Sequence, residues 1–345
     1  MYTRRAFLGS TAAAAAAAAT PRRARAAEFT FTIHHFLSPK APAQTRLIQP
    51  WADRITAASD GRIAFEIFPS MSLGGKPPEL YSQVRSGVAD IVWTLPGYTP
   101  GVFPRLEVFE LPTVHGGSAA VTTRAIQDVM PMLADDLAAV TPLLVHTHAG
   151  NALHTVSRDV NGPGDVAGLK LRSPSRTGVW MLESWGAEPV GMPVPALPQA
   201  LSKGTIDGAL IPFEVAIPLK IAQLAEYSIE LDGGRRFGTS TFLFAMNSER
   251  FAALPADLQA IVAENSGAAI ADEIGTAWDG IEPVGKKIAT DAGRTVKALS
   301  AEATAEFDAL HESLSARWLA EAAGRGIDGE ALLAAALGAM KAQAA

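Results

Sequence analysis

The 345-residue sequence contains no cysteine, and this absence removes several chemistries at once. Without thiols the chain can form no disulfide, no thiolate nucleophile and no cysteine-ligated zinc site. Such a composition is compatible with an oxidising compartment. Any function must therefore be built from other side chains.

Positive charge is also scarce. Lys and Arg total 29 against 35 Asp and Glu, which gives a net charge of −6, and no basic run follows the first 27 residues. This balance argues against nucleic acid and against an anionic membrane surface as partners, and it leaves a small solute open. With 48% hydrophobic and 19% charged residues, the chain can form two domains, or one large one, each with a core.

Long hydrophobic runs are absent after the N-terminus. Residues 1–27 carry an arginine pair at 4–5, an alanine-rich run centred on 12–19 and a small-x-small site at 24–26. This pattern predicts a twin-arginine export signal that is removed at maturation. The alternative is a transmembrane anchor, but it needs ~20 apolar residues, and three further arginines close this run too early. We therefore expect a periplasmic protein whose mature chain has no stable membrane insertion.

The easily recognised catalytic motifs are missing too. The sequence has no Gly-x-Ser-x-Gly elbow, no P-loop and no His-Glu-x-x-His motif. His146 and His148 stand two apart on an expected strand, with His154 nearby, a set that could hold a transition metal. Because no Asp or Glu stands beside them at ligand spacing, we predict histidines of a pocket or strand surface, with no metal and no cofactor.

Apolar periodicity predicts an α/β fold. Strand, helix, strand, helix and strand follow one another in the first part of the chain, an order that favours a parallel, doubly wound sheet, and a second series of such units follows. The expected elements include strands at 29–36, 62–68, 91–93 and 236–248, a long helix from Pro255 to about Ala289 that is broken or kinked at its glycines and at Pro283, and a helical tail from Ala301.

Four segments together resemble a known family. They are LKLRSPSRTGVWMLESWGAEPVGMPVPALPQALSKGTIDGALIP (169–212), GRIAFEIFPSMSLGG, LYSQVRSGVADIVWT and VFPRLEVFELP. In order and spacing they resemble the DctP-type solute-binding proteins of tripartite ATP-independent periplasmic (TRAP) transporters, over nearly all of the mature chain. The resemblance implies a two-lobed α/β protein that closes around an organic acid and delivers it to membrane-embedded TRAP permease subunits.

The resemblance also suggests how the chain divides between the lobes. We expect lobe I to contain 28–149 and about 236–276, and lobe II to contain 150–235 and about 277–345. The chain would cross between lobes near Ala149 and near Arg235, with the long helix spanning both. Closure about this hinge would trap the ligand and exclude water.

Arg172 is the strongest candidate for contact with a ligand. It ends the strand in LKLRSP, and ligands of doubly wound sheets bind outside the carboxyl ends of the strands. In the family that this sequence resembles, the arginine at this place pairs with the ligand carboxylate, and a guanidinium can bind a carboxylate through two parallel hydrogen bonds. The alternatives are an exposed arginine or an internal ion pair. Arg176, four residues on, is expected at the surface.

Other pocket candidates come from strand ends and the turns after them. The predicted ligand-binding residues besides Arg172 are His34, His35, Trp93, Tyr98, Asn151, His154, Trp180, Val194, Ile211 and Phe213. For Trp93, Trp180 and Phe213 an ordinary place in the core is the alternative, because large aromatic side chains are readily buried in either setting. Glu214 is expected at the hinge or the surface, since an unpaired anion beside an anionic ligand is costly.

Departures from the family pattern bear on the ligand. The resemblance leads us to expect a second arginine, an asparagine and an aromatic residue at positions that here hold Ala152, Ile211 and Val194. We therefore expect a hydrophobic monocarboxylate, preferably an aromatic acid such as benzoate, mandelate or benzoylformate. Small aliphatic hydroxy or keto acids are the second choice. A secreted enzyme acting on carboxylic acids and the binding protein of an ATP-driven importer are the rival classes.

Overall fold

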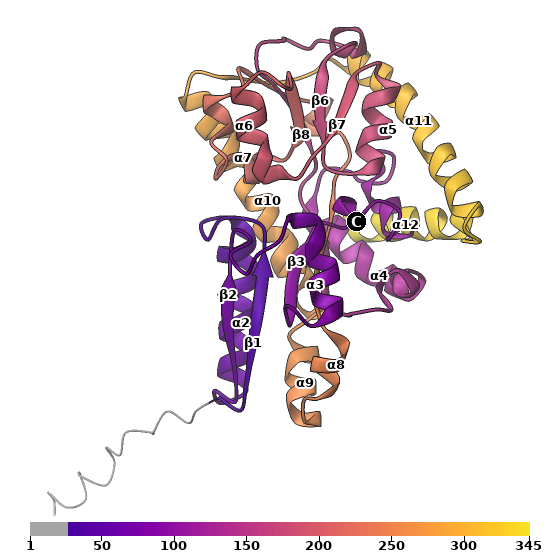
Figure 1. Cartoon of the computed structure of the whole chain (residues 1–345). Coiled ribbons are helices and arrows are strands. Elements are labelled where there is room, and N and C mark those ends of the chain that lie inside the picture. The colour runs from indigo at the N-terminus through magenta and orange to yellow at the C-terminus, as the bar shows by residue number, and fades with distance from the viewer. Residues whose placement is uncertain (1–26) are drawn as a thin grey trace, which may run out of the picture.

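The computed structural model describes residues 27–345, so the predicted export signal lies outside the described residues except for Ala27. The chain forms two lobes, each built on its own β-sheet and covered by helices (Figure 1). The prediction of a two-lobed α/β protein is confirmed. Within residues 27–345, no helix is both long and apolar enough to cross a membrane.

Lobe I, the lower one in Figure 1, contains a five-stranded sheet in the order β2-β1-β3-β10-β4. Its elements are β1 (Phe29–His35), α2 (Gln49–Ala58), β2 (Ile63–Phe68), α3 (Leu80–Ser86), β3 (Ile91–Thr94), α4 (Ala119–Leu137), β4 (Thr141–Thr147) and β10 (Thr241–Met246). The first three strands are parallel, as expected from the helices that connect them. β10 runs antiparallel to both β3 and β4, so the whole sheet is mixed.

Lobe II contains a six-stranded sheet in the order β11-β9-β5-β8-β6-β7. Its elements are β5 (Ala152–Thr155), β6 (Lys170–Ser173), α5 (Arg176–Ser184), β7 (Glu188–Gly191), α6 (Leu197–Ser202), β8 (Gly208–Ile211), α7 (Phe213–Ala216), β9 (Tyr227–Glu230) and β11 (Thr295–Ala298). β6 is parallel to β7 and β8, whereas β5 is antiparallel to β8 and β9. The sequence reading did not identify the short strands β9 and β11.

The chain crosses between the lobes along two adjacent segments. The first connects β4 to β5 and the second connects β9 to β10, and they pair through the amide of Asn151 with the carbonyl of Gly238 (2.8 Å) and the amide of Phe237 with the carbonyl of Asn151 (2.9 Å). Two paired crossings act as a hinge between the sheets.

The predicted long helix spans both lobes, but it is interrupted and forms two consecutive helices. α9 (Ala256–Glu264) and α10 (Ala268–Asp291) are separated at Gly267, whose φ of +58° and ψ of −129° are not helical. Gly275 packs against the backbone of Ala120 in lobe I, and Gly285 packs against the backbone of Phe213 in lobe II. A Cβ at either glycine would approach backbone atoms to 2.5 Å or less, so these two positions allow the helix to lie against both lobes.

The C-terminal helices return the chain to lobe I. α11 (Ala301–Ala323) packs on α5 of lobe II, and α12 (Gly329–Ala344) packs on α4 of lobe I. The Nε of Arg124 on α4 donates to the side-chain oxygen of Gln343 on α12 at 2.9 Å. The predicted assignment of 277–345 to lobe II therefore does not describe α12, whose packing partner is in the other lobe.

Every histidine of the sequence is buried, and burial lowers the pKa of each one. His311 is packed among the rings of Trp185, Phe237 and Phe307, and its Nε2 accepts the indole N–H of Trp185 at 3.3 Å. Desolvation lowers the pKa of His311 to about 4, although nearby Asp308 acts in the opposite direction. The folded protein thus keeps this ring neutral where an unfolded chain would protonate it.

We predict that His311→Gln removes one acid-sensitive contribution to stability. The wild-type protein should lose about 1.4 kcal/mol per pH unit relative to the variant as the pH falls from 6 towards 4.5, because His311 takes up its proton only on unfolding. Glutamine still offers an acceptor to Trp185. Urea unfolding of both proteins at pH 7.5, 6 and 5 measures the difference; parallel pH profiles would contradict a neutral buried His311.

Candidate functional site

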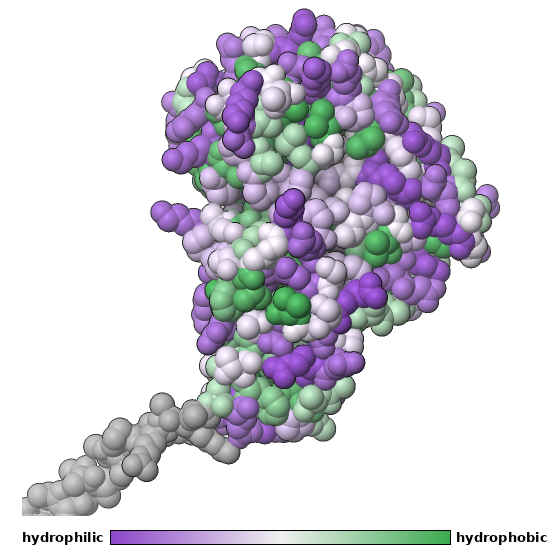
Figure 2. All heavy atoms as spheres, viewed as in Figure 1, coloured by the Kyte–Doolittle hydropathy of each residue, from purple (hydrophilic) through white to green (hydrophobic). Residues whose placement is uncertain are grey.

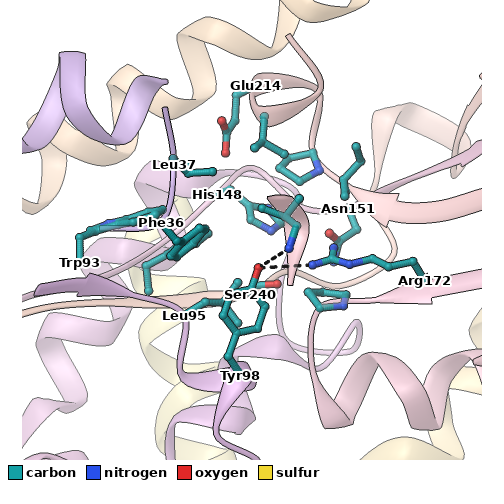
Figure 3. Close-up of a pocket in the computed structure, with 16 residues that line it drawn as sticks. Phe36, Leu37, Trp93, Leu95, Tyr98, His148, Asn151, Arg172, Glu214 and Ser240 are labelled. Atoms are coloured by element: carbon teal, nitrogen blue, oxygen red, sulfur yellow. Dashed lines mark hydrogen bonds between the residues drawn. The ribbon is translucent and has the colours of Figure 1, made fainter. Parts of the chain in front are cut away.

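A cavity lies between the two lobes, at the carboxyl ends of β1, β3, β6 and β8 (Figure 3). The space among its lining atoms that no atom occupies is about 350 Å³, which includes space open to solvent. The interlobe cavity is lined by Phe36, Leu37, Trp93, Leu95, Tyr98, His148, Asn151, Arg172, Pro174, Val194, Ile211, Pro212, Glu214, Val215, Ser240 and Phe242.

Arg172 supplies the positive charge of the cavity. It stands at the end of β6 with only 2% of its surface exposed. Its Nε donates to the carbonyl of Met192 (2.9 Å) and its Nη1 to the carbonyl of Leu210 (3.0 Å). Among residues 27–345 no carboxylate forms an ion pair with it. Burial lowers the pKa of this guanidinium, so a charged Arg172 favours an anionic partner.

Tyr98 connects the two lobes beside Arg172. It belongs to the 3₁₀ turn after β3 in lobe I, and its hydroxyl accepts the amide N–H of Val194 in lobe II at 2.8 Å. The same hydroxyl is 3.5 Å from Nη2 of Arg172, and Figure 3 draws both interactions as dashed lines. Burial raises the pKa of Tyr98, so the hydroxyl keeps its proton. The lobes are therefore closed on each other at this point.

Aromatic rings form one wall of the cavity. Trp93 stacks on Phe242 with ring centroids 4.6 Å apart, and Phe36 lies 5.0 Å from Trp93 and 5.4 Å from Tyr98. The indole N–H of Trp93 donates to Nε2 of His146 (2.9 Å), which leaves the indole without a free donor. This wall therefore offers flat apolar surface rather than hydrogen bonds.

Four polar side chains complete the lining: His148, Asn151, Glu214 and Ser240. Nδ1 of His148 accepts the amide N–H of Gly150 at 3.0 Å, so a neutral ring carries its proton on Nε2. Burial lowers the pKa of His148 well below its usual value and raises the pKa of Glu214 well above its own. Burial therefore disfavours the charged form of both groups, and Arg172 is the one arginine or lysine among the residues that line the cavity.

The structure brings together six of the residues singled out in the sequence: Arg172, Trp93, Tyr98, Asn151, Val194 and Ile211 all line the interlobe cavity. Arg176 is not a lone surface group. It pairs with Glu107 of lobe I at 2.6 Å and with Glu321 of α11 at 2.8 Å. Arg176 is partly exposed, with 19% of its side chain accessible, but it is paired because the helix that follows β6 faces the other lobe.

Five predicted residues lie outside this cavity. His34 and His35 are used within lobe I, where Nδ1 of His34 lies 2.8 Å from the Gln83 side chain and Nε2 of His35 lies 3.0 Å from that of Gln44. Alternation along β1 points the two rings to opposite faces, where helices cover them. The cavity is reached instead by the next two residues, Phe36 and Leu37.

The other three displaced residues pack elsewhere in lobe II. His154 bonds to Ser228 (2.9 Å) and meets the edge of Phe213 in a separate small cavity beside α10. Trp180 is held between the guanidinium groups of Arg176 and Arg317, at 4.6 and 4.5 Å from the ring centre. Each has its partners within lobe II or on the helices that cover it.

Sequence reasoning also missed residues that line the cavity. Ser240 and Phe242 come from the second crossing segment and β10, which are distant in sequence from the other lining residues. The sequence predicts Glu214 at the hinge or the surface, but Glu214 is 3% exposed and lines the cavity. The position of Glu214 just after a strand could have indicated a place in the cavity. Glu214 follows the end of β8 by three residues, and the lining residues Leu95 and Pro174 directly follow the ends of β3 and β6.

The histidines considered for a metal do not gather around one. His146 accepts from Trp93, His148 accepts from Gly150, and His154 bonds to Ser228. Across residues 27–345 no three side chains of His, Asp or Glu come together in a way that could hold a metal ion. The interlobe cavity, with one cation and an aromatic wall, is instead suited to an organic anion.

A surface groove where the lobes meet lies next to the interlobe cavity. This groove has about 760 Å³ of empty space and is lined by Pro78, Gly97, Tyr98, Pro100, Ser173, Pro174, Ser175, Arg176, Val179, Gly191, Met192 and Pro193. Figure 2 shows mostly pale colour across this junction, as expected for Pro, Gly, Ser and Tyr. Tyr98 and Pro174 line both spaces, so they separate the cavity from the groove.

Comparison with known proteins agrees with this geometry. The sequence profile of the bacterial extracellular solute-binding proteins of family 7 (DctP) matches residues 33–321. A TRAP solute-binding protein from a marine metagenome, specific for aromatic acid ligands and solved with 3-hydroxybenzoate, is 40% identical, with a TM-score of 0.89, over 92% of this chain and 99% of its own.

Two further solved structures are similar over the same length. A TRAP solute-binding protein from Rhodoferax ferrireducens, solved with copurified benzoate, is 38% identical, with a TM-score of 0.88, over 91% of this chain and 98% of its own. One from Bordetella bronchiseptica, solved with (R)- and (S)-mandelate, is 26% identical, with a TM-score of 0.84, over 90% and 98%. The chain belongs to solute-binding protein family 7 and is a DctP-type solute-binding protein of the TRAP transporters.

Proposed function

We propose that this protein captures an aromatic monocarboxylate in the interlobe cavity and delivers it unchanged to a TRAP permease. The observation that carries this proposal is the buried guanidinium of Arg172, which faces an aromatic cavity without a carboxylate partner among the described residues. A ligand carboxylate would complete the fork of donors, and the flat walls of Trp93 and Phe36 would cover its ring.

The balance of charge favours a ligand with one negative charge. Arg172 contributes one cation, while burial disfavours a charge on His148 and on Glu214. A second carboxylate on the ligand would have no cation to meet, and burying an unpaired anion is costly. A small aliphatic acid would leave much of the aromatic wall uncovered. An aromatic monocarboxylate is therefore the better match.

The relatives support the same ligand class. The protein from the marine metagenome is described as specific for aromatic acids, and the structures from Rhodoferax ferrireducens and Bordetella bronchiseptica contain benzoate and mandelate. We assign this class to the present chain as a proposal. The homologues are solute-binding proteins rather than enzymes, so we further propose that the bound acid is not converted.

Membership of the family also suggests how the protein is exported, closes on the acid and releases it. We propose export through the twin-arginine signal of residues 1–27, closure of the lobes about the two crossing segments near Ala149 and Arg235, and release of the acid to the permease. Lobe I would then contain 28–149 and about 236–276, and lobe II would contain 150–235 and the chain from about 277 to the end of α11. Binding drives closure only if the closed state binds the acid more tightly than the open state.

The first experiment is a thermal-shift screen of the mature protein against benzoate, mandelate, benzoylformate, lactate, pyruvate, succinate and uronates. A ligand at 100 times its Kd adds roughly 2.7 kcal/mol to the free energy of unfolding. We expect stabilisation by the aromatic acids alone, and mass spectrometry should recover the bound acid unchanged. Stabilisation by succinate or uronates alone would contradict the proposed ligand class, and turnover would contradict binding without conversion.

Arg172→Ala should leave the fold intact and weaken benzoate binding by about a hundredfold or more, because a buried carboxylate loses its strong partner. Isothermal titration calorimetry measures the affinity, and circular dichroism checks the fold. Arg46→Ala is the matched control, since Arg46 is exposed on the surface of lobe I. An affinity within twofold of wild type for Arg172→Ala would refute the anchoring role.

Tyr98→Phe should weaken binding more modestly. The substitution keeps the ring but removes the acceptor of the Val194 amide across the lobes, and an unsatisfied buried N–H costs about 1–3 kcal/mol, equivalent to roughly 5- to 150-fold in affinity. Calorimetry with benzoate gives the affinity. Small-angle scattering should show that more ligand is needed to reach the compact form; a variant that closes and binds as wild type does would exclude this contact as a closure element.

A further inference from the structure

The carboxyl group of Glu214 lines the interlobe cavity on a different side from Arg172. Glu214 lies in the first turn of the short helix α7, directly after β8 and Pro212, and it is 3% exposed. Its Oε2 is buried and has no hydrogen-bond partner among the described residues. In Figure 3 the carboxyl group of Glu214 points into the group of lining side chains, and Arg172 enters that group from another side.

The surroundings of Glu214 favour the protonated, neutral form of this carboxyl group. Its own amide donates to Oε1 of Glu282 on α10 at 2.9 Å, so a second carboxylate lies beside it. Arg236 binds Glu282 (3.0 Å) and Glu230 (2.9 Å), and Lys286 binds Glu230 (2.7 Å), so neither cation forms an ion pair with Glu214. Burial and the charge of Glu282 together raise the pKa of Glu214 well above its usual value.

A neutral carboxyl group can both donate and accept a hydrogen bond. Trp278 on α10 acts in the opposite direction on the pKa of Glu214, but less strongly than burial, and Oε2 of Glu214 keeps no hydrogen-bond partner among the described residues. Aliphatic and aromatic side chains such as Leu37, Val215 and Phe36 form the adjacent lining. Beside these apolar side chains, a polar atom without a hydrogen-bond partner favours a ligand that forms a hydrogen bond with it.

We propose that Glu214 binds a hydroxyl group on the ring of the ligand, so that the preferred substrate class is a hydroxylated aromatic monocarboxylate. This inference rests on the proposed function, because it assumes that Arg172 holds the carboxylate of the same molecule. A phenolic hydroxyl can accept a hydrogen bond from the O–H of a protonated Glu214 or donate one to its carboxyl oxygen, so it suits either orientation of the group. A second carboxylate at that position would meet Glu282 and is disfavoured.

The direct test compares ligands that differ only in the group offered to Glu214. Calorimetry on the wild-type protein would use benzoate, 3- and 4-hydroxybenzoate, and the matching 3- and 4-methylbenzoates. The methyl group has a size similar to that of the hydroxyl but cannot form the hydrogen bond. One of the two hydroxybenzoates should bind at least about tenfold more tightly than the methyl compound of the same substitution pattern.

Variants separate the role of Glu214 from general polarity of the cavity. Glu214→Met should remove the preference for the hydroxyl compound while benzoate still binds, and Glu214→Gln should keep most of the preference because an amide also donates and accepts. Ser240→Ala is the matched control: it removes another buried hydroxyl without a partner from the same cavity, and the ratio between hydroxyl and methyl compounds should stay unchanged.

The outcomes distinguish this inference from the proposed function. If the wild-type protein binds benzoate but shows equal affinity for hydroxyl and methyl compounds, the role of Glu214 is refuted and the proposed function stands. A preference that persists in Glu214→Met, or disappears in Ser240→Ala instead, also refutes it. If no aromatic acid binds, the proposed function itself fails and this inference falls with it. The wild-type comparison is informative even if a variant does not fold.

Discussion

A guanidinium held out of water without a carboxylate is the constraint on which the rest of this structure depends. Backbone carbonyls at Met192 and Leu210 and the hydroxyl of Tyr98 orient Arg172, but neutral acceptors cannot balance its charge. The closed protein therefore carries an electrostatic cost that an organic anion would offset. This arrangement couples closure to occupancy, because the state that buries the charge is also the state that holds the acid most tightly.

Two polar contacts join the lobes at the start of α5, close to this charge. Glu107 of lobe I binds Arg176 at 2.6 Å, and burial raises the pKa of Glu107 to about 7 in spite of that partner. Glu110 accepts the hydroxyl of Thr177 at 2.6 Å across the same junction. Polar contacts of this kind can exchange for water when the lobes separate, whereas a wide apolar interface could not. They are consistent with a protein that must both close and open.

Sequence patterns located the strand ends, and with them Arg172, Trp93 and Tyr98, because the carboxyl ends of parallel strands gather at one edge of a sheet. The same patterns could not predict which helices cover each face of a strand. Alternation identified His34 and His35 as strand residues, but only the packing of the helices shows that Gln83 and Gln44 occupy the space beside them.

Residues brought in from distant segments were beyond sequence reasoning for a related reason. Ser240 and Phe242 reach the cavity through a chain crossing between the lobes, and no local periodicity records where that crossing lies. The position of α12 on lobe I likewise depends on the surface of α4, because an alanine-rich C-terminal helix carries no signal for which lobe it will cover. Local sequence patterns predict the helices and strands, whereas contacts between distant segments determine which residues line the interlobe cavity.

The two close glycine contacts of α10 have a mechanical consequence. Gly275 and Gly285 are ten residues apart, which separates their contacts with lobe I and lobe II by about 15 Å along the helix axis and about 80° around it. One helix, α10, thus contacts both lobes through two glycines at a defined spacing along its axis. Sliding of one lobe past the other would break one of these close backbone contacts. Opening should therefore proceed by bending or twisting of α10 between the two contacts rather than by shear.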